Sequence, residues 1–125
     1  MHQTIYEELK RVAKKQKKTT YKAIASMAGL NLDIPEHWKE LARILAEIST
    51  HEHNHGRPLL SAVVVLQATD MEKARPGNNF FTLARNLGLY SGYGELADRV
   101  FFSKELSRVH IAWKEPAADR SEMNT

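Results

Sequence analysis

Apolar residues in the first part of the chain recur at helical spacing. Three of them lie four and three positions apart and would share one face of a helix: Ile5, Leu9 and Val12. This pattern predicts a helix over residues 4–16, with Thr4 as its N-cap and Glu7 completing a capping box. The β-prone residues 19–21 then predict a short strand.

Two further helices follow in the pattern. Thr20 is a suitable N-cap for a short helix that ends at Ala28, because Gly29 can adopt the left-handed conformation that often follows a helix. After a turn, a longer helix is predicted over residues 35–54, with Asp33 as its cap. Its buried stripe has spacings of three, four and three positions: Trp38, Leu41, Leu45 and Ile48.

The second half of the chain contains one strong strand pattern. Residues 59–66 are apolar except for Ser61, which predicts a strand that is buried on both faces. A polar loop with a Pro-Gly turn precedes a short helix over residues 80–88, and a last helix is predicted over residues 95–114. The last helix has its own apolar stripe: Phe102, Leu106, Val109 and Trp113. The polar tail 115–125 is expected to be disordered.

Three helices followed by β-structure is the element order of a winged helix-turn-helix. A chain of 125 residues with 42% hydrophobic content fits one domain. We therefore expect an α+β, mostly α, domain over residues 1–114. It would have a winged helix-turn-helix-like core, one strong strand and extra C-terminal helices. A complete wing needs a second strand paired with residues 59–67, and only the segment before Phe80 leaves room for it.

Composition excludes several kinds of chemistry. The chain has no cysteine, which removes disulfides, thiolate metal sites and thiol nucleophiles. Its longest apolar run, residues 62–66, is far too short to span a membrane. The first ten residues lack the basic-then-apolar pattern of a signal peptide. We therefore expect a cytoplasmic protein with no membrane partner.

The charge is small in total but unevenly distributed. The net charge is +3, yet residues 9–32 hold seven basic residues and no acidic one: Lys10, Arg11, Lys14, Lys15, Lys17, Lys18 and Lys22. The rest of the chain has 11 basic residues against 15 acidic ones. A basic segment on a slightly acidic body favours a polyanionic partner, and a lysine-rich helix face that serves only solvation is the alternative.

The segment KKTTYKAIASMAGL resembles the DNA-binding domain of the O6-alkylguanine-DNA alkyltransferases and their alkyltransferase-like relatives. The matching residues are Thr19, Thr20, Tyr21, Ile24, Ala25, Ala28 and Gly29. A looser similarity extends over residues 4–81. The resemblance implies a tyrosine, Tyr21, that presses on a DNA phosphate. It places Lys39 near the family's arginine that fills the gap left by a flipped base, and Arg43 one turn later.

The same resemblance also marks where the chain departs from the family. Ser61 falls near the family's alkyl-accepting cysteine, and Ala62 and Val63 stand in place of the following His and Arg. Without a thiolate, direct alkyl transfer is excluded. A lysine at position 39 is a poor replacement for a planar guanidinium in a base stack, which weakens the case for base flipping.

The predicted outer face of the third helix carries three acids and two bases: Glu36, Lys39, Glu40, Arg43 and Glu47. That mixture is a poor surface for the major groove, where phosphates flank every base edge. The basic charge lies instead on the first helix and the approach to the second, which suits contact with the phosphate backbone better than the reading of bases. The alternative is that the third helix faces a protein and the lysines are only solvated.

The segment THEHNHGRP contains two further candidates. His51 and His55 would share a helix face at i and i+4 and could hold a metal, with Glu52 as the only nearby base. Histidines in the last turn of a helix also serve its free carbonyls, so the metal site is the lesser hypothesis. Arg57 could hold a phosphate, although a salt bridge to Asp70 or Glu47 is the preferred interpretation.

These observations predict a non-enzymatic DNA-binding protein that contacts mainly the phosphate backbone, without a cofactor, in regulation or as an accessory of DNA processing. The predicted contact residues are Lys14, Lys15, Lys17, Lys18, Thr20, Tyr21, Lys22, Lys39, Arg43 and Arg57. One alternative is a protein-binding adaptor or inhibitor on the same scaffold, and another is a small metal-dependent enzyme that uses the histidines of residues 51–55. The last helix and Trp113 could also serve a homodimer.

Overall fold

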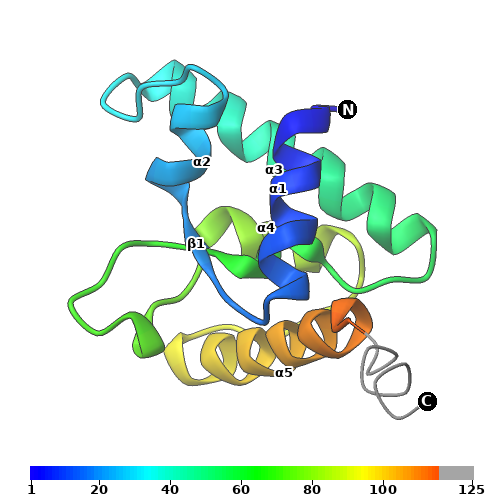
Figure 1. Cartoon of the computed structure of the whole chain (residues 1–125). Helices are drawn as coiled ribbons and strands as arrows, with labels where there is room; N and C mark the ends of the chain where they lie inside the picture. Colours follow the sequence, from blue (N-terminus) through cyan, green and yellow to red (C-terminus); the bar gives the residue numbers. More distant parts are fainter. Residues whose placement is uncertain (116–125) are drawn as a thin grey trace, which may run out of the picture.

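The computed structural model describes residues 1–115, in which five α-helices surround a short central segment (Figure 1). The helices are α1 (Gln3–Lys14), α2 (Tyr21–Met27), α3 (Pro35–Asn54), α4 (Asn78–Asn86) and α5 (Glu95–Trp113). The other elements are the strands β1 (Thr19–Thr20) and β2 (Val64–Val65) and the 3-10 helices η1 (Leu60–Val63) and η2 (Met71–Lys73). The predicted mostly helical α+β class is confirmed, and the tail beyond Glu115 lies outside the described residues.

The buried centre of the fold is the segment around η1, where a continuous strand over residues 59–66 was predicted. That prediction is wrong, because Leu60–Val63 form η1 and only Val64–Val65 are extended. Burial on both faces is confirmed, since α1, α3 and α5 all contact η1. Helices enclose Leu60–Val63, and only the next two residues, Val64–Val65, pair with a strand. A 3-10 turn satisfies part of its backbone, and the amide of Ser61 donates to the Ser49 hydroxyl at 3.0 Å.

The two strands pair in parallel, with Thr19 opposite Val64 and Thr20 opposite Val65. This pairing joins the connection between α1 and α2 to the central segment. The segment before Phe80 forms η2 and a turn instead of the second strand that a wing requires. The part of the chain that the structure describes therefore contains one two-stranded parallel sheet and no wing hairpin.

Both ends of α1 differ from the prediction. Its N-cap is His2 rather than Thr4, because the His2 ring accepts a hydrogen bond from the backbone of the first turn at 3.2 Å. The capping box does not form, and the carboxylate of Glu7 lies 2.7 Å from the Lys10 ammonium instead. At the other end, Gln16 has a φ of 61°, and this left-handed conformation stops the helix before the predicted boundary.

The boundaries of α2 and α3 agree well with the sequence. The Thr20 hydroxyl caps α2 at 3.2 Å, and Gly29 has the expected positive φ of 68°. Only the cap of α3 is wrong: Ile34 occupies that position without a side-chain bond, and the Asp33 amide donates to Asn31 Oδ1 at 2.9 Å. Within the predicted stripe of α3, Trp38 is half-buried and the other three residues are buried: Leu41, Leu45 and Ile48.

Two buried carboxylates fix the chain where it leaves α3 and enters η1. Glu52, which is fully buried, accepts hydrogen bonds from Arg57 at 2.9 and 2.7 Å and from the Tyr6 hydroxyl at 2.9 Å. Glu105 on α5 is 2% exposed and accepts a 2.8 Å bond from the amide of Leu59. The start of η1 is therefore held from two sides by acidic side chains that have their own partners.

Helix α5 covers one side of the core, and apolar residues also lie on its outer face. Phe102 and Val109 are buried, as the predicted stripe requires. The outer face carries three exposed apolar residues: Leu96, Val100 and Ile111. Within residues 1–115, no helix combines the length and the apolar character needed to cross a membrane.

Candidate nucleic-acid interface

The structure distributes the ten predicted contact residues over separate places. Four lie at the end of α1 and in the turn after it: Lys14, Lys15, Lys17 and Lys18. Three lie where β1 leads into α2, two lie on α3, and Arg57 follows α3. In Figure 1 the end of α1 lies next to α5, whereas the first half of α3 lies near α2 at the other end of α1. The α1 lysines and the α3 cations are therefore not brought together.

Tyr21, the predicted phosphate contact, lies in the interior. It is 3% exposed, and its ring packs against Trp38 with a centroid distance of 4.9 Å. Its hydroxyl accepts a 2.9 Å bond from the amide of Gly77 and donates to Asn79 Oδ1 at 3.3 Å. Burial raises the pKa of this hydroxyl, which stays neutral. Tyr21 thus fixes the turn before α4, and Thr20 uses its hydroxyl as a helix cap.

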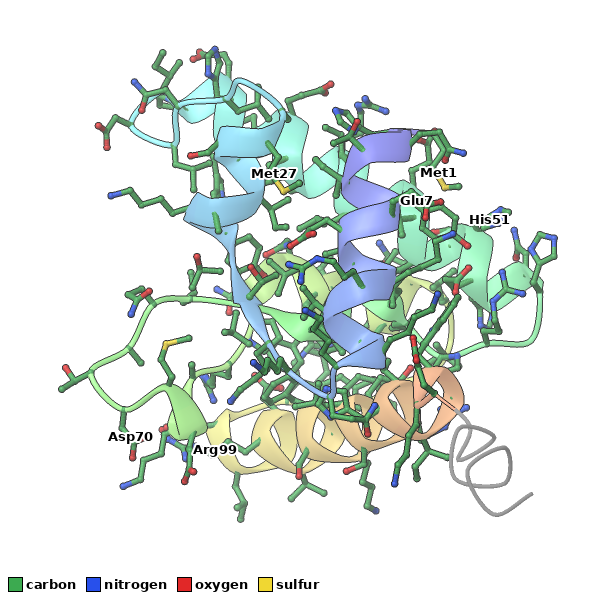
Figure 2. The ribbon with its side chains drawn as sticks, viewed as in Figure 1. Met1, Glu7, Met27, His51, Asp70 and Arg99 are labelled. Atoms are coloured by element: carbon green, nitrogen blue, oxygen red, sulfur yellow. The ribbon has the colours of Figure 1, made fainter. Side chains whose placement is uncertain are left out.

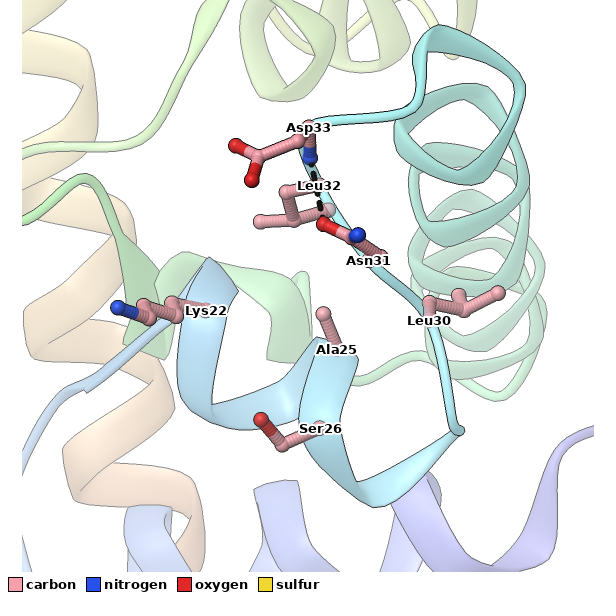
Figure 3. Close-up of a pocket in the computed structure, with 7 residues that line it drawn as sticks. All are labelled: Lys22, Ala25, Ser26, Leu30, Asn31, Leu32 and Asp33. Carbon is pink, nitrogen blue, oxygen red and sulfur yellow. Dashed lines mark hydrogen bonds between the residues drawn. The ribbon is translucent and has the colours of Figure 1, made fainter.

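The turn between α2 and α3 contains a shallow hollow of about 330 Å³ (Figure 3). Lys22 and Asp33 contribute one charge of each sign to its lining. In Figure 3 the Lys22 ammonium points away from the loop residues, and the Asn31 side chain bonds the Asp33 backbone within the turn. The hollow therefore has neither a charge excess nor convergent polar groups that would select a ligand.

The outer face of α3 neutralises part of its own charge. Arg43 forms two hydrogen bonds with Glu40, at 2.7 and 2.8 Å, and the Arg43 contact lowers the pKa of that carboxyl. Lys39 is exposed and makes no ion pair within residues 1–115. With Glu36 and Glu47 also exposed, this face has no excess of positive charge.

Arg57 forms a salt bridge, as preferred, but its partner is Glu52 rather than Asp70 or Glu47. The guanidinium also lies 6.0 Å from the Trp113 ring. Burial alone would raise the pKa of the Glu52 carboxyl, but hydrogen bonds from Arg57 and Tyr6 outweigh it, so this pKa lies below the ordinary value. Arg57 thus pairs with the buried carboxylate of Glu52.

Two side chains of the histidine cluster, His51 and His55, contact each other. The rings of His51 and His55 have a centroid distance of 4.3 Å, and His55 Nδ1 faces the His51 carbonyl oxygen at 2.8 Å. The proposed base, Glu52, is turned into the core. Within residues 1–115 no group of three or more histidine, aspartate and glutamate side chains is placed to hold a metal ion.

A groove opens between the end of α1, η2 and α5. It consists of two hollows, of about 350 and 260 Å³, which share Lys18 and Glu72 as lining residues. Lys17 and Met71 complete the outer hollow. The inner hollow, which we call the inner cleft, is lined by cations from three parts of the chain: Lys18, Lys73, Arg75 and Arg99. We call the two hollows together the basic groove. Figure 2 labels Asp70 and Arg99 at this end of the molecule, and His51 on the opposite side.

The contacts of its cations show how the basic groove is built. Lys18 donates to the carbonyl oxygens of Met71 and Glu72 at 2.6 and 3.3 Å, which holds η2 against the start of β1. Arg99 pairs with Glu95 at 3.1 Å. Arg75 is half-buried, and its Nη1 atom is buried without a hydrogen-bond partner in the described part of the chain. The groove therefore combines excess positive charge with an unsatisfied donor.

Sequence reasoning identified the lysines at the end of α1 but missed Lys73, Arg75 and Arg99. These three lie in segments of mixed charge, far from residues 14–18 along the chain, and only the tertiary structure brings them to the groove. The one local signal was the pair of cations two positions apart in MEKARP.

Comparisons with known proteins do not place the chain in a family: no family model, curated protein or solved structure matches it. The resemblance to the alkyltransferase DNA-binding domain therefore stays a prediction.

Proposed function

We propose that this protein binds DNA mainly through the phosphate backbone, without catalysing a reaction, as a regulatory or accessory factor in DNA processing. The observation that carries the proposal is the basic groove. It adds Lys73, Arg75 and Arg99 to Lys17 and Lys18, and Glu72 is the one acidic residue that lines it. Cations that converge in excess over the nearby acids favour a polyanion, because each phosphate contact releases counterions.

The proposal keeps a winged-helix-like core, with α2 and α3 as its helix-turn-helix and an alkyltransferase-like relationship as its origin. It moves the main DNA contact away from α3. The face that would enter the major groove has Arg43 paired with Glu40, whereas Lys14, Lys15 and Lys17 are exposed and make no ion pair within residues 1–115. Contact between the basic groove and the phosphate backbone does not require α3 to enter the major groove of the DNA.

A binding isotherm with a short fluorescent duplex, at about 50 and about 200 mM salt, tests the proposal. Wild-type affinity should fall steeply with salt. The variant Lys14→Glu/Lys17→Glu should lose affinity at least about tenfold and reduce the salt slope by about two, one for each phosphate contact. Both side chains are exposed, so the variant should fold normally.

The matched control is Lys22→Glu/Lys39→Glu, which makes the same charge change on exposed positions of α2 and α3. It should lose clearly less affinity than Lys14→Glu/Lys17→Glu. A larger loss in the control would assign DNA contact to the helix-turn-helix. Weak wild-type binding that ignores salt would overturn DNA binding itself.

A protein-binding adaptor or inhibitor is the second candidate function, and the outer face of α5 favours it. Leu96 and Ile111 are 77% and 76% exposed, and Val100 lies between them. In this case Leu96→Ser/Ile111→Ser should abolish binding to a purified partner that tolerates Lys14→Glu/Lys17→Glu. Sedimentation velocity of the same variants distinguishes a foreign partner from a second copy of the chain.

A further inference from the structure

We propose that the inner cleft binds a terminal phosphate monoester of a nucleic-acid strand. This inference rests on the proposed function and adds the part of the DNA that the cleft takes, namely a strand end. The inference depends on the size of the cleft, on its charge and on the lack of a partner for Arg75 in the described part of the chain.

The size of the inner cleft suits a phosphate group. Its volume of about 260 Å³ is below the range of about 300–1,000 Å³ that is usual for small-molecule pockets. The cations line a recess between η2 and α5, with Phe102 and Leu106 as apolar neighbours. An internal phosphate is tethered to a nucleotide on both sides, whereas a terminal phosphate is tethered on one side and can turn three oxygens toward these cations.

The charge of the cleft also distinguishes the two kinds of phosphate. Its four cations face Glu72 in the lining and Glu95, which pairs with Arg99, so two positive charges are left uncompensated. A phosphate monoester carries about −1.5 to −2 at neutral pH, whereas a backbone phosphate carries one negative charge. The excess in the cleft therefore matches the terminal group.

Arg75 supplies the specific interaction. Its side chain lines the cleft, is half-buried and makes no ion pair within residues 1–115. Its Nη1 atom is fully buried without an acceptor, so contact with a phosphate falls to the accessible part of the guanidinium. A terminal phosphate offers three acceptor oxygens, and a guanidinium can bind two of them side by side. The Lys18 ammonium is already bonded to two carbonyl oxygens and contributes charge rather than recognition.

The test uses the full chain and one oligonucleotide sequence in three forms: 5′-phosphorylated, 3′-phosphorylated and hydroxyl at both ends. One phosphorylated form should bind at least about tenfold more tightly than the hydroxyl form, since a charge-assisted hydrogen bond to a phosphate contributes about that factor. The two phosphorylated arms identify which strand end the cleft takes. The preference should decline from about pH 7.5 to about pH 5.5, because the second pKa of the phosphate is about 6.

Two variants examine the cleft, and the measured quantity is the ratio of affinities for phosphorylated and hydroxyl ends. Arg75→Gln should reduce this ratio to near one. Lys73→Gln/Arg99→Gln should do the same, and it changes only exposed side chains if Arg75→Gln does not fold. The control Lys14→Gln/Lys15→Gln removes two charges outside the cleft, so it should weaken binding to all three forms alike and keep the ratio.

Equal affinity for all three forms, with steep salt dependence, would overturn this inference and leave the proposed function standing. Inorganic phosphate is the second probe. If it stabilises the wild-type protein but not Lys73→Gln/Arg99→Gln against heat, and no DNA binds, both the nucleic-acid source and the proposed function are overturned.

Discussion

Two half-buried arginines, Arg57 and Arg75, differ in what the fold places beside them. Arg57 follows α3 and binds the fully buried carboxylate of Glu52 through two hydrogen bonds. Arg75 follows η2, and one of its guanidinium nitrogens is buried without a partner in the described residues. The sequence predicted a DNA contact for Arg57 and none for Arg75. Whether an arginine receives a carboxylate partner is decided by the fold, and the local sequence does not show it.

The same difference separates the two charged surfaces of the molecule. On α3, Glu40 lies three positions before Arg43, and this spacing alone brings the two side chains together on the helix surface. In the basic groove the cations come from the end of α1, from the η2 region and from α5, and Glu72 is the one acid among the lining residues. Local pairing therefore leaves α3 without an excess of positive charge, whereas tertiary convergence gives the groove more cations than acids.

The largest expected effect comes from breaking the Arg57 pair. Arg57→Met leaves Glu52 as a buried carboxylate without its cation, and we expect the free energy of unfolding at neutral pH to fall by about 3 kcal/mol. Urea denaturation measures it. DNA affinity of the folded variant should not change. A stable variant that loses DNA affinity would make Arg57 a ligand-binding residue and remove the contrast with Arg75.

The pH dependence of stability should change in the same variant. In the wild type the Glu52 pKa lies below the ordinary 4.5, so its contribution is present above about pH 4.5 and lost as the pH falls further. In Arg57→Met burial should raise this pKa above the ordinary value. The loss of stability should then grow as the pH rises above about 4.5 and shrink toward pH 4 by more than about 1 kcal/mol. Urea midpoints across this range check the reversal.

Removal of the Arg75 side chain should increase stability, in contrast to removal of Arg57. Arg75→Met eliminates a buried donor that has no acceptor, and it reduces repulsion within the basic groove. We expect the free energy of unfolding to rise by about 1 kcal/mol. A comparable loss of stability, measured by the same urea titration, would show that the Arg75 side chain is satisfied in solution.

The smallest effect is expected on α3. The double substitution Glu40→Gln/Arg43→Gln removes an exposed ion pair and should change the free energy of unfolding by at most about 0.5 kcal/mol. It should also leave DNA affinity within about twofold, because the net charge of the face is unchanged. A large loss of affinity would return the main contact to the helix-turn-helix.

Much of the first half of the fold followed from local rules. The Thr20 cap, the positive φ of Gly29 and the extent of α3 are set by residues within a few positions of each other. The first cap was missed because the His2 ring took the role that hydroxyl side chains usually have. Local chemistry was therefore a good guide to helix existence and a weaker guide to helix ends.

The centre and the groove could not be predicted in the same way. Residues 59–66 are as apolar as a buried strand, but the helices around them decide that only Val64 and Val65 are extended. Arg57 and Glu52 are five positions apart, across the end of α3, where no periodicity links them. The groove depends on α5 lying beside η2, a contact that no local pattern encodes.

The parallel pairing of β1 and β2 also sets the order in which the chain can fold. Thr19 pairs with Val64, which is 45 positions further along the chain, so this contact closes a long loop. The entropic cost of closing that loop must be met before the two residue pairs of the sheet contribute any stability. The helices α1, α2 and α3 can form early from nearby contacts. The basic groove depends on a contact of similar range, because Lys18 reaches η2 across 53 positions.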